Sequence, residues 1–357
     1  MEGWLVGVLL TIVSAAGSTC GLILQKIAHL REQEAKRLGK ETKTFSCFDI
    51  PCNKYFIAGF IMLALVPLPF DFIALANAGQ SIVLPVGTGC TVIFGQMLAP
   101  KLLGEKLTRL DIAATLVITS GTILSTATGT HKSPTYTASR LLYLYTLTPF
   151  IVTITIISIA TFVCIVIAHN PKLQNKLYES VKIPVLAFIP SSLGAIQIMV
   201  FKVVGELTKN TLYGYTETYV EYDITNGTRT EISKQRHVKT NEFLNPTLYL
   251  YIFLVVSLAV GQLSYLNRGL AQYDAIKFLP IYNTTLLMVG VTCGAVYFQE
   301  YSAFHPAWFP VGCILEILGI LALSWKVEED GKESNQNQPK ASETEPSGST
   351  MTKITPA

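Results

Sequence analysis

The segment LPVGTGCTVIFGQMLAPKLLGE, residues 84–105, has a counterpart in LPIYNTTLLMVGVTCGAVYFQE, residues 279–300. Each segment opens with Leu-Pro, ends in Glu and is mostly apolar between them. The two align without a gap, so that Pro85 meets Pro280 and Glu105 meets Glu300. An apolar segment of about 20 residues can cross the hydrocarbon core of a bilayer as a helix. The repetition therefore indicates two related membrane spans.

The composition also indicates a membrane protein. Of the 357 residues, 50% are hydrophobic and only 14% are charged, whereas soluble proteins have roughly 25% charged residues. The apolar residues gather in nine segments: 3–28, 55–77, 80–103, 108–128, 144–169, 182–205, 246–272, 275–299 and 304–326. We therefore predict an all-α polytopic membrane protein with nine transmembrane helices.

A second correspondence fixes the order of the repeat. The stretch SAAGSTCGLILQK (14–26) matches PSSLGAIQIMVFK (190–202), and each ends in Lys. Spans 1–4 thus repeat as spans 6–9. Because span 5 lies between them, the second copy enters the membrane from the opposite side. Inverted repeats around a central cavity are typical of secondary transporters, with the substrate site near the midplane.

The chain divides into a first repeat, a link, a second repeat with an inserted loop, and a tail. The ranges are 3–128 for the first repeat, 129–181 for span 5 and its flanking loops, 182–205 for the start of the second repeat, 206–246 for the outer loop, 246–326 for the rest of the second repeat and 327–357 for the tail. The tail is polar and aperiodic, so we expect a disordered cytoplasmic segment.

The outer loop carries two signals. Apolar and polar residues alternate on both sides of Asn226-Gly227, which predicts a β-hairpin with a tight turn. Asn226-Gly227-Thr228 is also an N-glycosylation sequence, which is usable only outside the cytoplasm. Most Lys and Arg residues fall on the cytoplasmic side if the N-terminus is outside and the C-terminus inside. This orientation places Asn226 outside.

The chain resembles the NIPA-type magnesium transporter family of the drug/metabolite transporter superfamily. The matching stretches are GLILQKIAHLRE (21–32), FDFIALANAGQSIVLPVG (70–87), APKLLGEKLTRLD (99–111), QLSYLNRGLAQYDAIKFLPIY (262–282) and VYFQE (296–300). The resemblance implies two inverted helix bundles around a cavity, and passage of Mg2+ or related divalent cations as the activity. It implies no set of ligand residues.

Candidate residues on an ion path are acids and amides at membrane depth. Glu316 is apolar on both sides in CILEILGILAL, and an acid within a bilayer is costly enough to be a functional candidate. Asp71 follows Pro67 and Pro69, which interrupt span 2. The alternatives are a protonated Glu316 bonded to a neighbouring helix and a hydrated, interfacial Asp71. The amide candidates are Gln96, Gln197, Asn267 and Asn283; most such amides serve interhelical hydrogen bonds.

Four further residues stand at the ends of spans. Glu105 and Glu300 close the repeated segment at opposite faces, and we expect them chiefly to cap helix junctions. Lys26 and Lys202 are matched across the repeat. They either extend to the membrane interface or contact an anionic substrate.

Three function classes follow. The first is a gradient- or potential-driven transporter of Mg2+, and the second is a transporter of an anionic metabolite on the same fold. The third is a membrane adaptor that transports nothing. An enzyme is not expected, because the chain has neither HExxH, a pair of membrane aspartates nor a P-loop.

The remaining expectations concern cofactors, partners and location. We expect no cofactor, no nucleic acid and no fixed structural metal site, since structural zinc requires four ligands. The expected partners are the lipid bilayer and Mg2+ as substrate, and the sequence leaves open a homo-oligomer and cytosolic partners of the tail. A plasma membrane and an endosomal or vacuolar membrane both fit.

Overall fold

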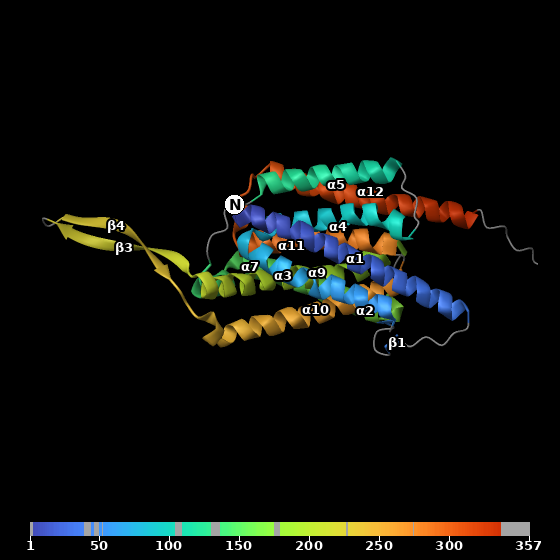
Figure 1. Ribbon diagram of the computed structural model, residues 1–357, viewed down its shortest axis with the longest axis horizontal. Coiled ribbons are helices and arrows are strands. Elements are labelled where there is room, and N and C mark those ends of the chain that lie inside the picture. The colour runs from blue at the N-terminus through green and yellow to red at the C-terminus, as the bar shows by residue number, and fades with distance from the viewer. Residues whose placement is uncertain are drawn as a thin grey trace, which may run out of the picture.

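The computed structural model describes residues 3–38, 44–45, 50–51, 53–103, 109–129, 136–174, 179–225, 228–273 and 275–336. Long helices lie roughly along one common direction and form a bundle (Figure 1). A β-hairpin projects from one end of the bundle, which we call the hairpin end. The opposite end, where α12 leaves the bundle, is the tail end.

The first half contains α1 (Gly3–Arg37), α2 (Lys54–Phe60), α3 (Pro67–Asn77), α4 (Gln80–Leu103) and α5 (Arg109–Thr128). A two-residue pair, β1 (Thr44–Phe45) and β2 (Ile50–Pro51), precedes α2, and the π-helical turn η1 (Ile61–Leu65) joins α2 to α3. The Val66 amide donates to the Ile61 carbonyl in this turn, and Pro67 then starts α3 because it has no amide hydrogen to donate.

The middle and second half follow. They contain α6 (Ala138–Leu144), α7 (Thr148–His169), α8 (Pro171–Gln174), α9 (Glu179–Tyr213), β3 (Tyr215–Thr225), β4 (Thr228–Val238), η2 (Glu242–Leu244), α10 (Pro246–Gln272), α11 (Ala275–Tyr297), η3 (Glu300–Ser302) and α12 (Trp308–Gln336). The strands β3 and β4 pair antiparallel from Tyr215 opposite Val238 to Thr225 opposite Thr228. The outer loop thus forms a two-stranded hairpin.

Seven of the helical segments in the described ranges are long and apolar enough to cross a membrane. They are Gly3–Glu32, Lys54–Asn77, Gln80–Leu102, Arg109–Thr128, Thr148–His169, Val181–Tyr213 and Pro246–Leu270. Two further apolar stretches, Ile281–Tyr297 in α11 and Trp308–Ala322 in α12, are shorter. The protein is therefore a mostly helical, polytopic membrane protein. That it crosses the membrane nine times stays a prediction.

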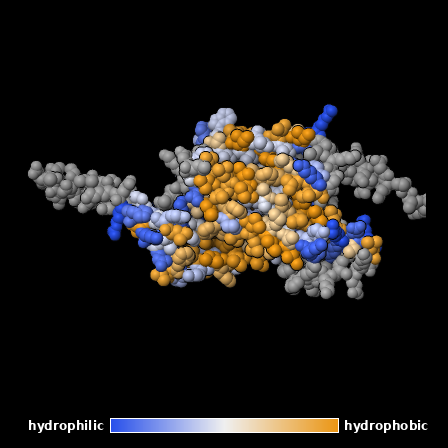
Figure 2. Space-filling model, viewed as in Figure 1, coloured by the Kyte–Doolittle hydropathy of each residue, from blue (hydrophilic) through white to orange (hydrophobic). Residues whose placement is uncertain are grey.

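The surface agrees with a membrane environment. Figure 2 shows a broad hydrophobic area along the middle of the bundle and hydrophilic residues near both ends. Large apolar side chains are exposed along α7 and α10, among them Ile156, Phe162 and Phe253. Such an extensive apolar surface would be unfavourable in water, whereas lipid chains solvate it well.

Two expected boundaries differ in the structure. Span 6 was expected to end at residue 205, but α9 continues to Tyr213. The expectation placed the end where apolar residues give way to charged ones, whereas Glu206 is buried within the helix. The tail was expected from residue 327, but α12 continues to Gln336, because Lys and Glu propagate a helix well once it has started.

Helices α5 and α12 pack closely through small residues. A Cβ added at Gly121 of α5 would lie 2.6 Å from the Glu316 backbone nitrogen. A Cβ added at Gly312 of α12 would lie 2.5 Å from the Ser125 nitrogen. Such glycines allow close backbone contact, which drives helix association in lipid.

We expect Gly121→Ala to destabilise the folded protein by ~1–3 kcal/mol, because the added methyl group must push α12 away from α5. Thermal unfolding of the purified protein in detergent measures this as a lower Tm. Gly95→Ala is the matched control, since a Cβ at Gly95 meets nothing within 4 Å. An unchanged Tm for Gly121→Ala would contradict the close packing of these helices.

Candidate functional site

Glu316 lies completely buried in the bundle, with 0% of its surface exposed. It stands near the middle of the apolar stretch Trp308–Ala322 of α12. The Thr88 hydroxyl of α4 is 2.8 Å from Glu316 Oε1, and the buried Thr122 hydroxyl of α5 lies near the same carboxyl group without a hydrogen-bond partner in the described ranges. Within the described ranges, Glu316 Oε2 has no hydrogen-bond partner.

The neighbouring glycines create the space for this carboxyl group. A Cβ added at Gly89 would lie 3.0 Å from Glu316 Oε1 and even closer to the Thr122 hydroxyl. Because Gly121 has no side chain, the backbone of α12 can lie directly against α5 at this position. Three helices thus meet at one carboxyl group, and two of them, α4 and α5, come from the first half of the chain.

The hydrogen bonds around Glu316 allow two protonation states. Thr88 Oγ1 is also 2.8 Å from the Leu84 carbonyl oxygen. A hydroxyl has one hydrogen and cannot donate it to Leu84 and to Glu316 at once. When Thr88 donates to Leu84, a protonated Glu316 can donate to Thr88; when Thr88 donates to Glu316, the carboxylate can be ionised. The group can therefore hold a proton or, when ionised, face a cation.

Glu300 forms a second polar cluster at the hairpin end. Its Oε1 accepts a hydrogen bond from the backbone N–H of Gln80 at 3.0 Å, and its Oε2 accepts one from the backbone N–H of Ser81 at 2.9 Å. These amides begin α4, where backbone N–H groups lack helical partners. A Cβ added at Gly79 would lie 3.2 Å from the same carboxylate. Glu300 thus caps a helix of the first half of the chain.

Lys202 of α9 completes this cap with an ion pair. Its Nζ lies 2.6 Å from Glu300 Oε1, and the two side chains are 1% and 2% exposed. The ammonium group also lies 4.1 Å from the centre of the Phe298 ring. Burial raises the pKa of Glu300, but the charge of Lys202 and hydrogen bonds from Lys202 and Ser81 outweigh burial and hold that pKa below its ordinary value.

Glu206 follows Lys202 by one turn of α9 and is also completely buried. Both of its carboxylate oxygens are without a hydrogen-bond partner among the residues that the structure describes. Lys202, Lys209 and Glu300 are near enough to act on it electrostatically. A buried carboxylate without hydrogen bonds is unfavourable when ionised, so this position favours a bound proton or cation.

The other predicted site residues are dispersed. Asp71 of α3 is half-buried and interacts with the Ser14 hydroxyl of α1. Lys26 is half-buried on the part of α1 nearer the tail end. The four amide candidates, Gln96, Gln197, Asn267 and Asn283, lie on α4, α9, α10 and α11. Asn267 is buried and the other three are half-buried, and in the described ranges no hydrogen bond joins them to Glu316. Glu105 and Asn226 lie outside the described residues.

Sequence reasoning missed Glu206 as well as Thr88, Thr122 and the first amides of α4. Glu206 was assigned to the outer loop because it follows an apolar run. Its spacing of four residues from Lys202 was the available signal, since such residues share one helix face. The pairing of Lys202 with Glu300 had no local signal, because 98 residues separate them.

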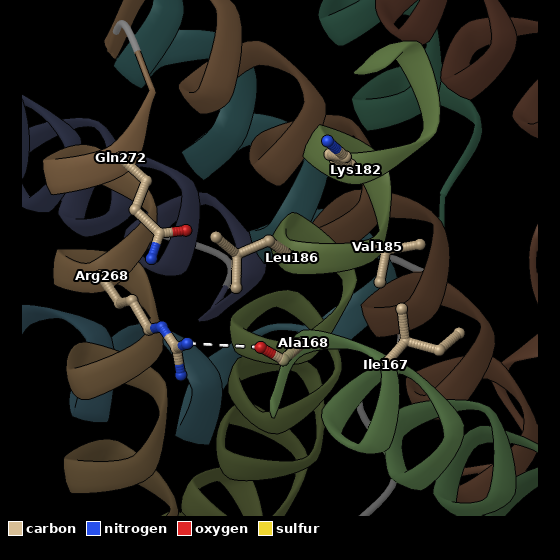
Figure 3. A pocket seen from close by; sticks show the side chains of 7 residues that line it. All are labelled: Ile167, Ala168, Lys182, Val185, Leu186, Arg268 and Gln272. Carbon is tan, nitrogen blue, oxygen red and sulfur yellow. Dashed lines mark hydrogen bonds between the residues drawn. The ribbon is translucent and has the colours of Figure 1, made fainter. Parts of the chain in front are cut away.

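A small pocket lies apart from both clusters. It is lined by Ile167, Ala168, Lys182, Val185, Leu186, Arg268 and Gln272 (Figure 3). Arg268 donates to the Ala168 carbonyl oxygen at 3.3 Å. None of the candidate residues lines this pocket. Among the described residues, no group of three or more His, Cys, Asp or Glu side chains could hold a metal ion.

Buried acids and a buried ion pair inside an apolar helix bundle define a class of protein. They are expensive in a membrane and typically mark ion or substrate pathways. The fold and these clusters together are those of a polytopic membrane protein with polar sites between its helices.

The comparisons specify the family. The family model described as "Magnesium transporter NIPA" matches residues 2–224. The chain belongs to this family, which confirms the resemblance seen in the sequence. It is a family of transporters, not of enzymes, so at family level the chain is a multi-pass membrane magnesium transporter.

Curated relatives are similar at low identity over much of their length. A protein of Arabidopsis thaliana named "Probable magnesium transporter NIPA8" is 22% identical over 91% of this chain and 70% of its own. A second Arabidopsis protein, "Probable magnesium transporter NIPA6", is 21% identical over 74% and 72% of the two chains. A "Probable magnesium transporter" of Candida albicans is 23% identical over 85% and 72%. No solved structure gives a significant match.

We expect Glu300→Gln and Glu206→Gln to change stability in opposite directions. Glu300→Gln leaves the Lys202 ammonium buried without its anion, which costs ~3–5 kcal/mol. Glu206→Gln removes a buried charge that has no hydrogen bonds, so in a buffer without divalent cations it is neutral or stabilising. Thermal unfolding in detergent with EDTA measures both. Equal losses of Tm would contradict the different surroundings of the two carboxyl groups.

Proposed function

We propose that this protein carries Mg2+ across a membrane along a path that passes Glu316. The main support for this proposal is the carboxyl group of Glu316. It is fully buried between α4, α5 and α12, and one of its oxygens has no hydrogen-bond partner in the described ranges. Carboxylate and hydroxyl oxygens suit Mg2+, which keeps several of its waters. Thr88 and Thr122 add hydroxyl oxygens at the same place. Other divalent cations could use the same ligands.

Inverted repeats provide the framework of this proposal. In the first half α1 packs against α3 and α4, and α4 against α5; in the second half α9 packs against α10 and α11, and α11 against α12. This equivalence supports spans 1–4 and 6–9 as two related copies and nine crossings in all. Glu316 of the second copy contacts the first copy at α4 and α5, as expected of a site between halves.

The repeat also gives Glu105 a role. The repeat alignment that pairs Glu105 with Glu300 also pairs Gln80 with Ala275 and Ser81 with Ile276. Ala275 and Ile276 are the first residues of α11. We propose that Glu105 caps α11 as Glu300 caps α4. In the proposed orientation, with the N-terminus outside and the C-terminus in the cytoplasm, the two caps stand at opposite faces of the membrane.

The membrane potential supplies the driving force in this proposal. An inside-negative potential of 100 mV favours entry of two positive charges by about 4.6 kcal/mol, so no nucleotide is required. An anionic metabolite is a weaker candidate, because Lys202 already pairs with Glu300 and offers little free charge. The proposed location is a plasma membrane or an endosomal or vacuolar membrane.

Mg2+ influx into proteoliposomes tests the proposal. Purified wild-type protein should admit Mg2+ when an inside-negative potential is imposed, and Glu316→Gln should reduce the rate at least about tenfold, which corresponds to 1.4 kcal/mol. The matched control is Glu34→Gln, the same chemical change at an exposed position of α1, which should leave the rate unchanged.

The outcomes separate transport from the role of Glu316. Flux that survives Glu316→Gln would make Glu316 a structural acid and move the path elsewhere. Wild-type protein that is folded and inserted but admits no Mg2+ would overturn the transport proposal, and uptake of an anionic metabolite or an adaptor role would then be tested.

Glycosylation tests the proposed orientation. Asn226 lies between the last paired residues of β3 and β4, Thr225 and Thr228. If the hairpin end faces outside, protein made in glycosylating cells should shift on a gel after removal of N-glycans, and Asn226→Gln should abolish the shift. An introduced acceptor sequence within the tail should remain unmodified. Modification of the tail but not of Asn226 would reverse the orientation.

A further inference from the structure

The proposed path at Glu316 does not use the hairpin-end cluster of Glu300, Lys202 and Glu206. Glu206 is the unexplained member, because it is 0% exposed and neither carboxylate oxygen has a hydrogen-bond partner among the described residues. A carboxylate in such surroundings needs a proton or a cation beside it. No ammonium or guanidinium group of the described residues forms an ion pair with it; Lys202 instead forms a salt bridge with Glu300.

Further oxygens in the same region are also unsatisfied. Gln80 Oε1 and Asn210 Oδ1 are buried and lack hydrogen-bond partners in the described part of the chain. The Gln80 backbone amide binds Glu300, whereas its side chain lies against α11, where Nε2 donates to the Gly290 carbonyl oxygen at 3.0 Å. Asn210 lies one turn beyond Glu206 on α9, and its Nδ2 donates to the Tyr136 carbonyl oxygen. Amide and carboxylate oxygens are the ligands that a hard cation takes.

The Lys202 ammonium contacts Glu300 but uses only part of its hydrogen-bonding capacity. It offers three N–H donors, and in the described ranges it has one oxygen partner, Glu300 Oε1 at 2.6 Å, together with the Phe298 ring. Lys209, the nearest other ammonium group on α9, donates to the Ala76 carbonyl oxygen at 2.7 Å instead. Lys202 therefore forms an ion pair with Glu300, whereas Lys202 and Lys209 act on Glu206 without an ion pair or a hydrogen bond in the described ranges.

We propose that Glu206 and Glu300 form a divalent-cation site at the hairpin end, in which the Lys202 ammonium is a built-in substitute for the ion. This inference rests on the proposed function, since it gives the transported cation a binding site at one end of the path. A divalent ion with its waters binds between the two carboxylates and displaces Lys202. It carries twice the charge of the Lys202 ammonium that it displaces.

The charged groups around the site determine how strongly the ion competes. Lys202 and Lys209 from α9 oppose a second cation, whereas Glu206 and Glu300 attract it. Tyr136, which interacts with both carboxylates, and the nearby Arg140 complete the set. Lys202 is the cation in direct contact with a carboxylate of the cluster, so its removal should strengthen binding most.

The test is Mg2+ binding to the purified full-length protein in detergent, measured by the dependence of Tm on MgCl2 and by isothermal titration. A ligand that binds the folded state raises Tm in proportion to its saturation. Lys202→Met should unfold at a lower temperature than wild type in EDTA, regain that Tm in Mg2+, and bind Mg2+ at least tenfold more tightly. Adding Glu206→Gln to Lys202→Met should abolish the regain.

Two controls keep the result specific. Lys101→Met makes the same change at an exposed position of α4 and should leave Mg2+ binding unchanged. Choline chloride at matched ionic strength should not replace MgCl2. If Lys202→Met does not fold even in Mg2+, Glu206→Gln alone decides, since it should weaken the Mg2+-dependent rise in Tm of the otherwise wild-type protein.

An affinity that is unchanged in Lys202→Met, or unaffected by Glu206→Gln, would overturn the proposal. Because the readout is binding, it is independent of flux. Normal Mg2+ flux with no tightening in Lys202→Met would refute this site and keep the transport proposal. Tightened binding without flux in any variant would keep the site and refute transport.

Discussion

The carboxylate of Glu300 connects parts of the chain that are far apart in sequence. It caps the start of α4, pairs with Lys202 of α9 and follows directly after α11. Each of its neighbours needs it, since the first amides of α4 lack helical acceptors and a buried ammonium requires an anion. The two side chains of the ion pair are almost fully buried, so water does not readily replace these contacts. The relative positions of α4, α9 and α11 at the hairpin end therefore depend on this one group.

The membrane class and the positions of most helices could be predicted from the sequence, because lipid imposes a simple rule. A span must be apolar over a fixed length, and segments such as 144–169 satisfy that rule plainly. The predicted β-hairpin also followed from local alternation around a two-residue turn. Both signals lie within about 25 consecutive residues, which is the scale on which sequence patterns are informative.

The candidate site was harder to predict because its parts are joined only by packing. Glu316 could be recognised as an acid in an apolar run, but Thr88 and Thr122 are ordinary hydroxyl residues on helices distant in sequence. Their role depends on the close approach that Gly89 and Gly121 allow. Glu206 was misplaced for a related reason. The rule that ends a span where its apolar run stops fails where opposite charges are buried together, and α9 extends eight residues beyond residue 205, to Tyr213.

The two clusters place different demands on a moving ion. At the hairpin end the chain already provides an ammonium group, so an arriving ion must compete with a tethered cation of half its charge. At Glu316 the described residues provide hydroxyl groups but no basic side chain in contact, so a cation there meets no such competitor. An ion that lost several of its waters at the first site would bind there too tightly to move on. Mg2+ gives up its waters reluctantly and so would keep most of them at that site. A site with a competing ammonium group, followed by a hydroxyl-lined carboxyl group without one, is consistent with the proposed capture and later release of a hydrated ion.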